Sequence, residues 1–161
     1  MTAQQEFRFE TLTPELVQYL EPWFDDPETI RYLGARDLLQ QELTLMHQEF
    51  GFEFHGNTVL SHYDWVIFDT DQAIALVVVE PYRNQTASLA FVVAPEARGL
   101  GFGQRVLVSV CNEPALENIK TLFANVEPEN MACCKCLTKE GFETSNVLDE
   151  DGFLEFTKSI H

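Results

Sequence analysis

Basic residues are scarce in this sequence, and no hydrophobic run is long enough to cross a membrane. Its 161 residues include 10 lysines and arginines against 26 aspartates and glutamates, which gives a formal net charge of −16 at pH 7. Nucleic acid is a poor partner for this balance, because no basic stripe is present to neutralise phosphates. An anionic membrane surface is disfavoured for the same reason. No apolar stretch reaches the ~18 residues that a bilayer requires. We therefore expect neither nucleic acid nor membrane as a partner.

A secretion signal and a cysteine-based metal site are also missing. The segment Met1–Glu6 has neither the basic start nor the apolar middle of a signal peptide, so we expect a cytoplasmic location. Zinc sites need paired Cys or His knuckles. No second knuckle follows the cysteine-rich segment, and the four histidines are scattered along the chain. We therefore expect no metal site and reduced, structural cysteines: Cys111, Cys133, Cys134 and Cys136.

What the sequence does contain is enough apolar material for one domain spanning residues 1–161. Hydrophobic residues make up 45% of the chain and include 13 phenylalanines, and this length suits a single domain. Apolar periodicity predicts strands at residues 7–11, 63–69, 73–80, 87–94, 120–126, 142–147 and 153–158. It predicts helices at residues 14–20, 37–50, 103–112 and 130–140, with a short turn at 26–34 and a loop at 51–62. This alternation predicts an α/β (α+β) fold around a mixed sheet.

The most informative segment is the glycine-rich turn Arg98-Gly99-Leu100-Gly101-Phe102-Gly103, which joins an expected strand to an expected helix. The first backbone N–H groups of a helix are free, and the helix dipole adds positive potential, so the turn predicts an anion site. Glycines let a phosphate approach the backbone closely. The segment is neither a Walker loop nor a dinucleotide fingerprint, because Gly103 is followed by Gln104 and the glycine spacing is G-x-G-x-G.

The spacing Arg-x-x-Gly-x-Gly, with Arg98, Gly101 and Gly103, resembles the acetyl-CoA pyrophosphate loop of the GNAT superfamily of N-acetyltransferases. A second segment is similar to the family's Asn-led helix that ends in Gly-Phe; its matching positions are Asn130, Cys133, Gly141 and Phe142. The resemblance covers residues 60–158 well. Residues 21–28 are similar to the openings of the aminoglycoside and ribosomal-protein acetyltransferase branches.

The resemblance implies a mostly antiparallel mixed sheet flanked by helices, in the order β-α-α-β-β-β-α-β-α-β-β. It implies an acetyl-CoA-dependent N-acetyltransferase that moves the acetyl group directly to a primary amine. Many members carry a tyrosine at the position of Leu137, where it protonates the leaving thiolate, and leucine cannot donate a proton. Leu137 therefore allows an alternative: a non-catalytic acyl-CoA-binding domain with a regulatory or interaction role.

The resemblance also implies which residues meet the cofactor. Backbone amides from Gly99 to Gln104 would hold the pyrophosphate, and the strand before the loop would pair with the pantetheine arm. A backbone N–H near Val92 or Val93 would polarise the thioester carbonyl. The expected cofactor-binding residues are Phe91, Val92, Val93, Arg98, Gly99, Leu100, Gly101, Phe102, Gly103, Gln104, Asn130 and Cys133. Two of these have a second interpretation, since Arg98 also suits a surface ion pair and Asn130 also suits a helix cap.

The candidate general bases are two carboxylates at strand ends, Glu80 and Glu127, each of which also suits a simple solvent-facing position. The proton donor to the thiolate is either water or Tyr82. The acidic balance mildly favours a cationic small molecule or a protein N-terminus as the amine, and a homodimer is compatible with the sequence. A covalent acyl-cysteine route is disfavoured, because no His or Asp lies near the cysteines in sequence.

Overall fold

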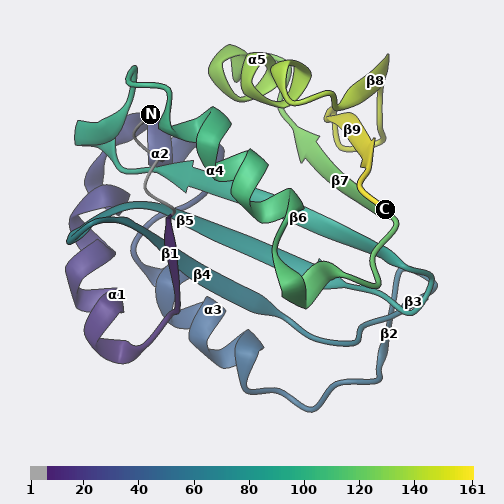
Figure 1. The fold of residues 1–161 in the computed structure, drawn as a ribbon, viewed down its shortest axis with the longest axis horizontal. Helices are drawn as coiled ribbons and strands as arrows, with labels where there is room; N and C mark the ends of the chain where they lie inside the picture. Colours follow the sequence, from purple (N-terminus) through teal and green to yellow (C-terminus); the bar gives the residue numbers. More distant parts are fainter. Residues whose placement is uncertain (1–6) are drawn as a thin grey trace, which may run out of the picture.

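The computed structural model describes residues 7–161, which form a seven-stranded sheet with helices packed around it (Figure 1). The strand order is β1-β4-β5-β6-β7-β9-β8, and every neighbouring pair is antiparallel except β6 and β7. The strands are β1 (Arg8–Thr11), β4 (Tyr63–Asp69), β5 (Gln72–Pro81), β6 (Thr86–Val93), β7 (Thr121–Val126), β8 (Glu143–Leu148) and β9 (Leu154–Ser159). The mixed, mostly antiparallel sheet that the sequence predicts is therefore confirmed.

The helices begin where the sequence supplies caps. The Thr13 hydroxyl accepts a hydrogen bond from the N–H of Leu16, and the Asp26 carboxylate accepts one from the N–H of Thr29; in both cases proline follows at the first helical position. The α-helices are α1 (Pro14–Leu20), α2 (Pro27–Tyr32), α3 (Asp37–Met46), α4 (Phe102–Cys111) and α5 (Met131–Lys139). Short 3-10 segments occupy Glu21–Asp25, Pro95–Ala97 and Pro114–Leu116.

Two details of the expected element order are wrong. Residues 51–62 are not only loop, because they contain a small hairpin of β2 (Glu53–Phe54) and β3 (Asn57–Thr58). Strands of two residues carry no measurable periodicity, so the pattern missed them. Three α-helices rather than two also precede β4, since Pro27 starts a separate helix α2 after the Asp26 cap. The helix expected at 37–50 ends earlier, at Met46.

The sheet opens between β6 and β7. These parallel strands pair at only three positions, of which Ser88 opposite Phe123 is the last. Beyond Ser88 the two strands diverge toward α4 and α5 (Figure 1). The second half of β6 therefore keeps its partner β5 on one side and leaves its other backbone edge free of strand pairing. A free edge of this kind can pair with an extended ligand.

Helices α3 and α4 pack on opposite faces of the sheet. Gly103 of α4 lies against Val93 of β6, which is in register with Ala75 of β5. Glu42 of α3 instead contacts His62 and lies beside Asp64, which is in register with Val78 of β5. Val78 is three residues from Ala75, and strand side chains alternate, so Asp64 and Glu42 are on the other face of the sheet. No helix in the described part of the chain is long and apolar enough to span a membrane.

Candidate functional site

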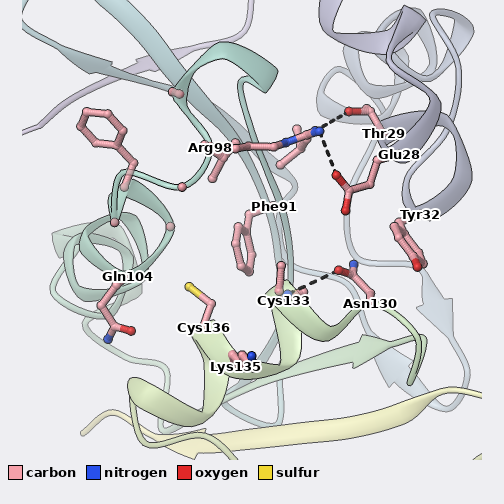
Figure 2. Close-up of a pocket in the computed structure, with 18 of the residues that line it drawn as sticks. Glu28, Thr29, Tyr32, Phe91, Arg98, Gln104, Asn130, Cys133, Lys135 and Cys136 are labelled. Atoms are coloured by element: carbon pink, nitrogen blue, oxygen red, sulfur yellow. Dashed lines mark hydrogen bonds and ion pairs between the residues drawn. The ribbon is translucent and has the colours of Figure 1, made fainter.

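A cavity of about 490 Å³ lies where β6 and β7 diverge (Figure 2). Its wall is formed by α2, the second half of β6, the glycine-rich turn and one face of α5. Every residue expected to bind the cofactor lines this cavity except Leu100, whose side chain is 68% exposed. Residues 91–93, 98–104 and 130–133, which are distant in sequence, thus meet around one space that is large enough for a ligand.

The glycine-rich turn presents bare backbone to the cavity. Gly99 and Gly101 have φ angles of +78° and +83°, a left-handed conformation that favours glycine. No atom lies within 4 Å of the position that a Cβ would take at either residue. Gly101 is the N-cap of α4 and contributes no side-chain cap, so the first N–H groups of this ten-residue helix have no side-chain acceptor there. Free amides at a helix N-terminus suit an anionic group.

Gly103 has a different role, because it lets two helices approach each other. A Cβ at this position would lie 3.1 Å from the Cys136 Sγ of α5 and 3.7 Å from a methyl of Val93. Helix α4 therefore packs close to α5 across the end of β6. A side chain at position 103 would push α4 and α5 apart and widen the cavity between them.

Arg98 forms ion pairs, which was one of its two sequence-based interpretations, but its partners belong to the start of α2 and were not foreseen. One of its guanidinium nitrogens lies 2.7 Å from the Asp26 carboxylate and 3.1 Å from that of Glu28. The other donates to the Thr29 hydroxyl at 2.7 Å, as Figure 2 shows for Glu28 and Thr29. The Arg98 hydrogen bond holds the pKa of Asp26 below its ordinary value. Arg98 thus ties the glycine-rich turn to α2, at the edge of the cavity.

Helix α5 forms the opposite wall. The Asn130 side chain accepts a hydrogen bond from the Cys133 N–H at 3.4 Å, which confirms the cap. Cys133 and Cys136 face the cavity (Figure 2), and burial raises their thiol pKa values to about 12 and about 11. Both are therefore protonated at neutral pH, so neither is a ready nucleophile. Leu137 is fully buried and does not line the cavity.

Sequence reasoning missed two lysines and one helix in the cavity wall. Lys135 and Lys139 both line it, and their i, i+4 spacing on α5 was a readable sign that they share a face. In a chain with 10 basic residues, such a pair stands out. Helix α2 contributes Glu28, Thr29, Tyr32 and Leu33. No local pattern brings α2 to this place, since its position follows from tertiary packing.

Neither candidate base lines the cavity, and no hydrogen bond or ion pair joins the two within residues 7–161. Glu80 is next to last in β5, in register with Ser88, the point where β6 and β7 part. The Tyr82 hydroxyl donates to the Glu80 carboxylate at 3.2 Å, and burial raises the pKa of Tyr82. Glu127 follows β7 and is half-buried; its backbone carbonyl accepts a hydrogen bond from the N–H of Asn130.

A buried histidine stands behind Glu80 and is surrounded by carboxylates. The His62 Nε2 atom lies 2.5 Å from Glu42 Oε2 and 3.3 Å from Asp64 Oδ2. Its Nδ1 atom lies 3.9 Å from Glu80 Oε1. Asp64 is the second residue of β4 and His62 immediately precedes the strand, and their side chains lie on the same side, 3.3 Å apart. Glu42 comes from α3, and only the tertiary fold brings it here.

The electrostatics of this cluster are unusual because its charges are unbalanced. Burial opposes the charged ring of His62, but hydrogen bonding with the surrounding carboxylates outweighs burial and raises the His62 pKa well above its ordinary value. Burial raises the pKa of Asp64, and the nearby Glu42 raises it further. No lysine or arginine forms an ion pair with Glu42, Asp64 or Glu80 in the described part of the chain.

Comparisons with known proteins agree with this geometry. Residues 7–143 match the family model of the acetyltransferase (GNAT) domain. YfmK of Bacillus subtilis (strain 168), an uncharacterized N-acetyltransferase, is 26% identical over 148 residues, which cover 91% of this chain and 93% of that protein.

Two solved structures are similar in fold. One is the aminoglycoside acetyltransferase AAC(6')-Ib in complex with coenzyme A, with a TM-score of 0.74, 14% identity, and coverage of 96% of this chain and 95% of that one. The other is the spermidine N-acetyltransferase from Vibrio cholerae in complex with coenzyme A and spermine, with a TM-score of 0.75, 15% identity, and coverage of 95% of both chains.

Proposed function

Since this chain belongs to the GNAT acetyltransferase family and is an acetyl-CoA-dependent N-acetyltransferase, we propose that it acetylates a primary amine by direct transfer at the point where β6 and β7 diverge. The acceptor is a cationic small molecule or a protein N-terminus. The single observation that carries the proposal is the bare glycine turn: Gly99 and Gly101 line a cavity bordered by a free strand edge, and open space surrounds the position that a Cβ would take at either residue.

Each part of acetyl-CoA has a matching part of the cavity. The backbone amides from Gly99 to Gln104 hold the pyrophosphate, and the helix dipole of α4 adds to their attraction. Lys135 and Lys139 supply positive charge on the facing helix. The free edge of β6 at residues 91–93 pairs with the pantetheine arm as an added strand would. The thioester end of the arm then points along β6 in the direction of Ser88, the last residue of β6 that pairs with β7.

Acetyl transfer needs a neutral amine, a polarised carbonyl and a proton for the departing sulfur. Glu80 takes a proton from the acceptor ammonium, directly or through water, and the freed amine lone pair attacks the thioester carbon. A backbone N–H near Val92 or Val93 stabilises the oxyanion. As the C–N bond forms and the C–S bond breaks, the nitrogen gives up its second surplus proton to water, and the thiolate takes a proton from Tyr82 or from water. Solvent then reprotonates Tyr82 if Tyr82 was the donor, and the Glu80 proton is released to solvent. Tyr82 is a candidate because its phenolic hydroxyl carries a proton at neutral pH and lies 3.2 Å from the Glu80 carboxylate.

Glu127 is the alternative base, because it follows β7 on the other side of the opening. Glu80 is the better supported of the two. It sits beside the proton donor Tyr82 at 3.2 Å and is in register with the last paired residue of β6. No side-chain contact of this kind orients the Glu127 carboxylate within the described residues.

A cationic acceptor is supported by charge and by the similar structures. The chain carries a formal net charge of −16, so it attracts cations, most strongly at low ionic strength. The similar structures include an aminoglycoside acetyltransferase and a spermidine acetyltransferase, which are in complex with an aminoglycoside and with spermine, both of them amines. Polyamines, aminoglycosides and peptides with free N-termini are therefore the first acceptors to assay.

The test of the cofactor site compares two glycines with the same backbone strain. Gly101 and Gly152 have φ angles of +83° and +84°, and neither has an atom within 4 Å of its Cβ position. Gly101→Glu places a carboxylate at the proposed pyrophosphate site, whereas Gly152→Glu places it in the turn before β9. We expect calorimetry with coenzyme A to show a loss of at least about 100-fold for the first variant and none for the second. Equal affinity in both variants would contradict the proposal.

A further inference from the structure

We propose that Glu42, His62 and Asp64 form a binding site for one divalent transition-metal ion, such as zinc or manganese, between α3 and β4. The inference concerns the face of the sheet opposite α4 and does not depend on which amine the enzyme acetylates. It departs from the expectation of no metal site, which rested on spacing along the chain. The fold joins Glu42 from helix α3, Asp64 from strand β4, and His62, which immediately precedes β4.

The three ligand atoms converge on one point. Glu42 Oε2, His62 Nε2 and a carboxylate oxygen of Asp64 all lie within 4.8 Å of one another. Ligands at about 2.0–2.2 Å from an ion lie roughly 3.0–3.5 Å from each other. The 3.3 Å between His62 and Asp64 already fits, and the 2.5 Å between His62 and Glu42 must widen by less than about 1 Å.

Asp64 provides an independent sign that a partner belongs here. It has no exposed surface, and neither of its carboxylate oxygens has a hydrogen bond of acceptable geometry. The nearby His62 Nε2 cannot satisfy it, because a single N–H points at one oxygen and the shorter contact is with Glu42. A fully buried carboxylate that accepts no well-aligned hydrogen bond is costly even beside a charged ring. A cation between the two carboxylates would satisfy both at once.

The other side of the His62 ring has the surroundings that metal-bound histidines have. A histidine that binds an ion through one ring nitrogen usually directs the other N–H at a carboxylate, which orients the ring. Here Nδ1 has no hydrogen bond and faces Glu80 Oε1 at 3.9 Å. With an ion bound at Nε2, the Glu80 carboxylate, the His62 ring and the ion would form a carboxylate–histidine–metal arrangement. Only the His62 ring would then separate the ion from Glu80, the proposed general base.

The charge and donor set indicate the class of ion. Three carboxylates, from α3, β4 and β5, face one imidazole, and burial makes their excess negative charge expensive. One nitrogen and two oxygen ligands suit zinc, manganese or cobalt, whereas calcium takes six to eight oxygens. On binding, His62 gives up the proton on Nε2 to solvent, and the ion takes its place between the ring and the carboxylates.

The first experiment uses the intact wild-type chain. Protein dialysed against a chelator and then against excess zinc is desalted, and bound zinc is counted by elemental analysis. We expect one ion per chain and, at zinc concentrations about 100 times the dissociation constant, a rise in melting temperature of roughly 5–10 °C. Substoichiometric zinc together with an unchanged melting temperature would overturn the proposal.

The second experiment identifies the ligands, because cysteines also bind zinc. Asp64→Asn and Glu42→Gln keep the side-chain shape and remove a ligand charge; Asp71→Asn, in the exposed turn between β4 and β5, is the control. We expect cobalt(II) affinity to fall at least about tenfold in the first two variants and to be unchanged in the third. Bound cobalt should show no sulfur charge-transfer band. A sulfur band, or affinity unchanged in all three variants, would overturn the assignment. Circular dichroism verifies that each variant is folded.

Discussion

The cavity at the β6–β7 opening and the cluster of Glu42, His62 and Asp64 differ in how they treat polar groups. In the cavity, backbone is left uncovered: open space surrounds the Cβ positions of Gly99 and Gly101, and no side chain caps the start of α4. In the cluster, polar groups are packed inside: His62 and Asp64 are buried among other charged side chains. The first arrangement is open to a large anionic ligand, whereas the second brings three charged side chains within 4.8 Å of one another in the interior. We therefore expect changes in the cavity to alter ligand binding and changes in the cluster to alter stability.

Glu80 lies between the two regions, so its removal gives the largest expected effect. We expect Glu80→Gln to lower kcat by about 10²- to 10⁴-fold, because an amide cannot accept the acceptor's proton. Affinity for coenzyme A should be unchanged, since Glu80 does not line the cavity. Steady-state release of coenzyme A with an amine panel, together with calorimetry, measures both quantities.

Glu127→Gln is the matched variant for the first prediction. We expect its kcat to stay within a fewfold of the wild type. The opposite ranking of the two variants would move the base to the β7 side of the opening. No loss in either variant would leave water as the proton acceptor.

Removing the histidine should affect stability and leave cofactor binding alone. His62→Gln leaves buried carboxylates without their cationic partner, so we expect a loss of about 3–5 kcal/mol in the free energy of unfolding. Urea unfolding in the presence of a chelator measures this loss separately from any metal effect. His47→Gln is the control, because His47 is exposed at the end of α3. Equal stability of both variants would show that the cluster holds little folding energy.

The lysines of α5 should show the reverse pattern, with weaker binding and unchanged stability. We expect Lys135→Ala and Lys139→Ala each to weaken coenzyme A binding about two- to fivefold, an effect that shrinks with added salt. Lys120→Ala removes an exposed lysine that does not line the cavity and should bind like the wild type. Calorimetry at two salt concentrations tests this. A salt-independent loss would contradict a purely electrostatic role.

The smallest expected effect concerns the ion pair between Arg98 and Asp26. Because Arg98 lowers the pKa of Asp26, the pair stabilises the fold above the ordinary aspartate pKa of 3.8, and this stabilisation is lost as pH falls through the lowered value. Asp26→Asn keeps a side-chain cap for α2, so we expect it to cost less than about 1 kcal/mol at pH 7. The difference from the wild type should shrink as pH falls below 3.8 and vanish once pH is below the lowered pKa of Asp26. A difference that persists there would point to the cap instead.

The two regions also differ in how far the sequence could predict them. The cavity was largely foreseen because its residues come in contiguous runs: a strand, a glycine turn and a capped helix each leave a local pattern. The contacts of Arg98 with α2 were not foreseen, because they join residues about 70 positions apart.

The cluster was missed for the same physical reason. Its spacing His62-x-Asp64 is readable as one strand face, but Glu42 lies 20 residues earlier on a helix. The sequence pattern fixes which face of α3 is apolar and not which side chain of β4 it meets. Similarly, the hairpin of β2 and β3 has no periodicity to detect, although its turn contains Gly56 at a φ of +82°.

The lysine pair on α5 has a kinetic consequence. Coenzyme A carries several phosphate charges, and it must approach a chain whose formal net charge is −16. At physiological ionic strength the field of a surface charge fades over about 8 Å, so Lys135 and Lys139 attract the cofactor only once it has reached the mouth of the cavity. As salt is added, the long-range repulsion between the acidic chain and the cofactor weakens before the short-range attraction to the two lysines does. Moderate ionic strength should therefore speed the arrival of the cofactor, and the same salt should slow the capture of a positively charged acceptor.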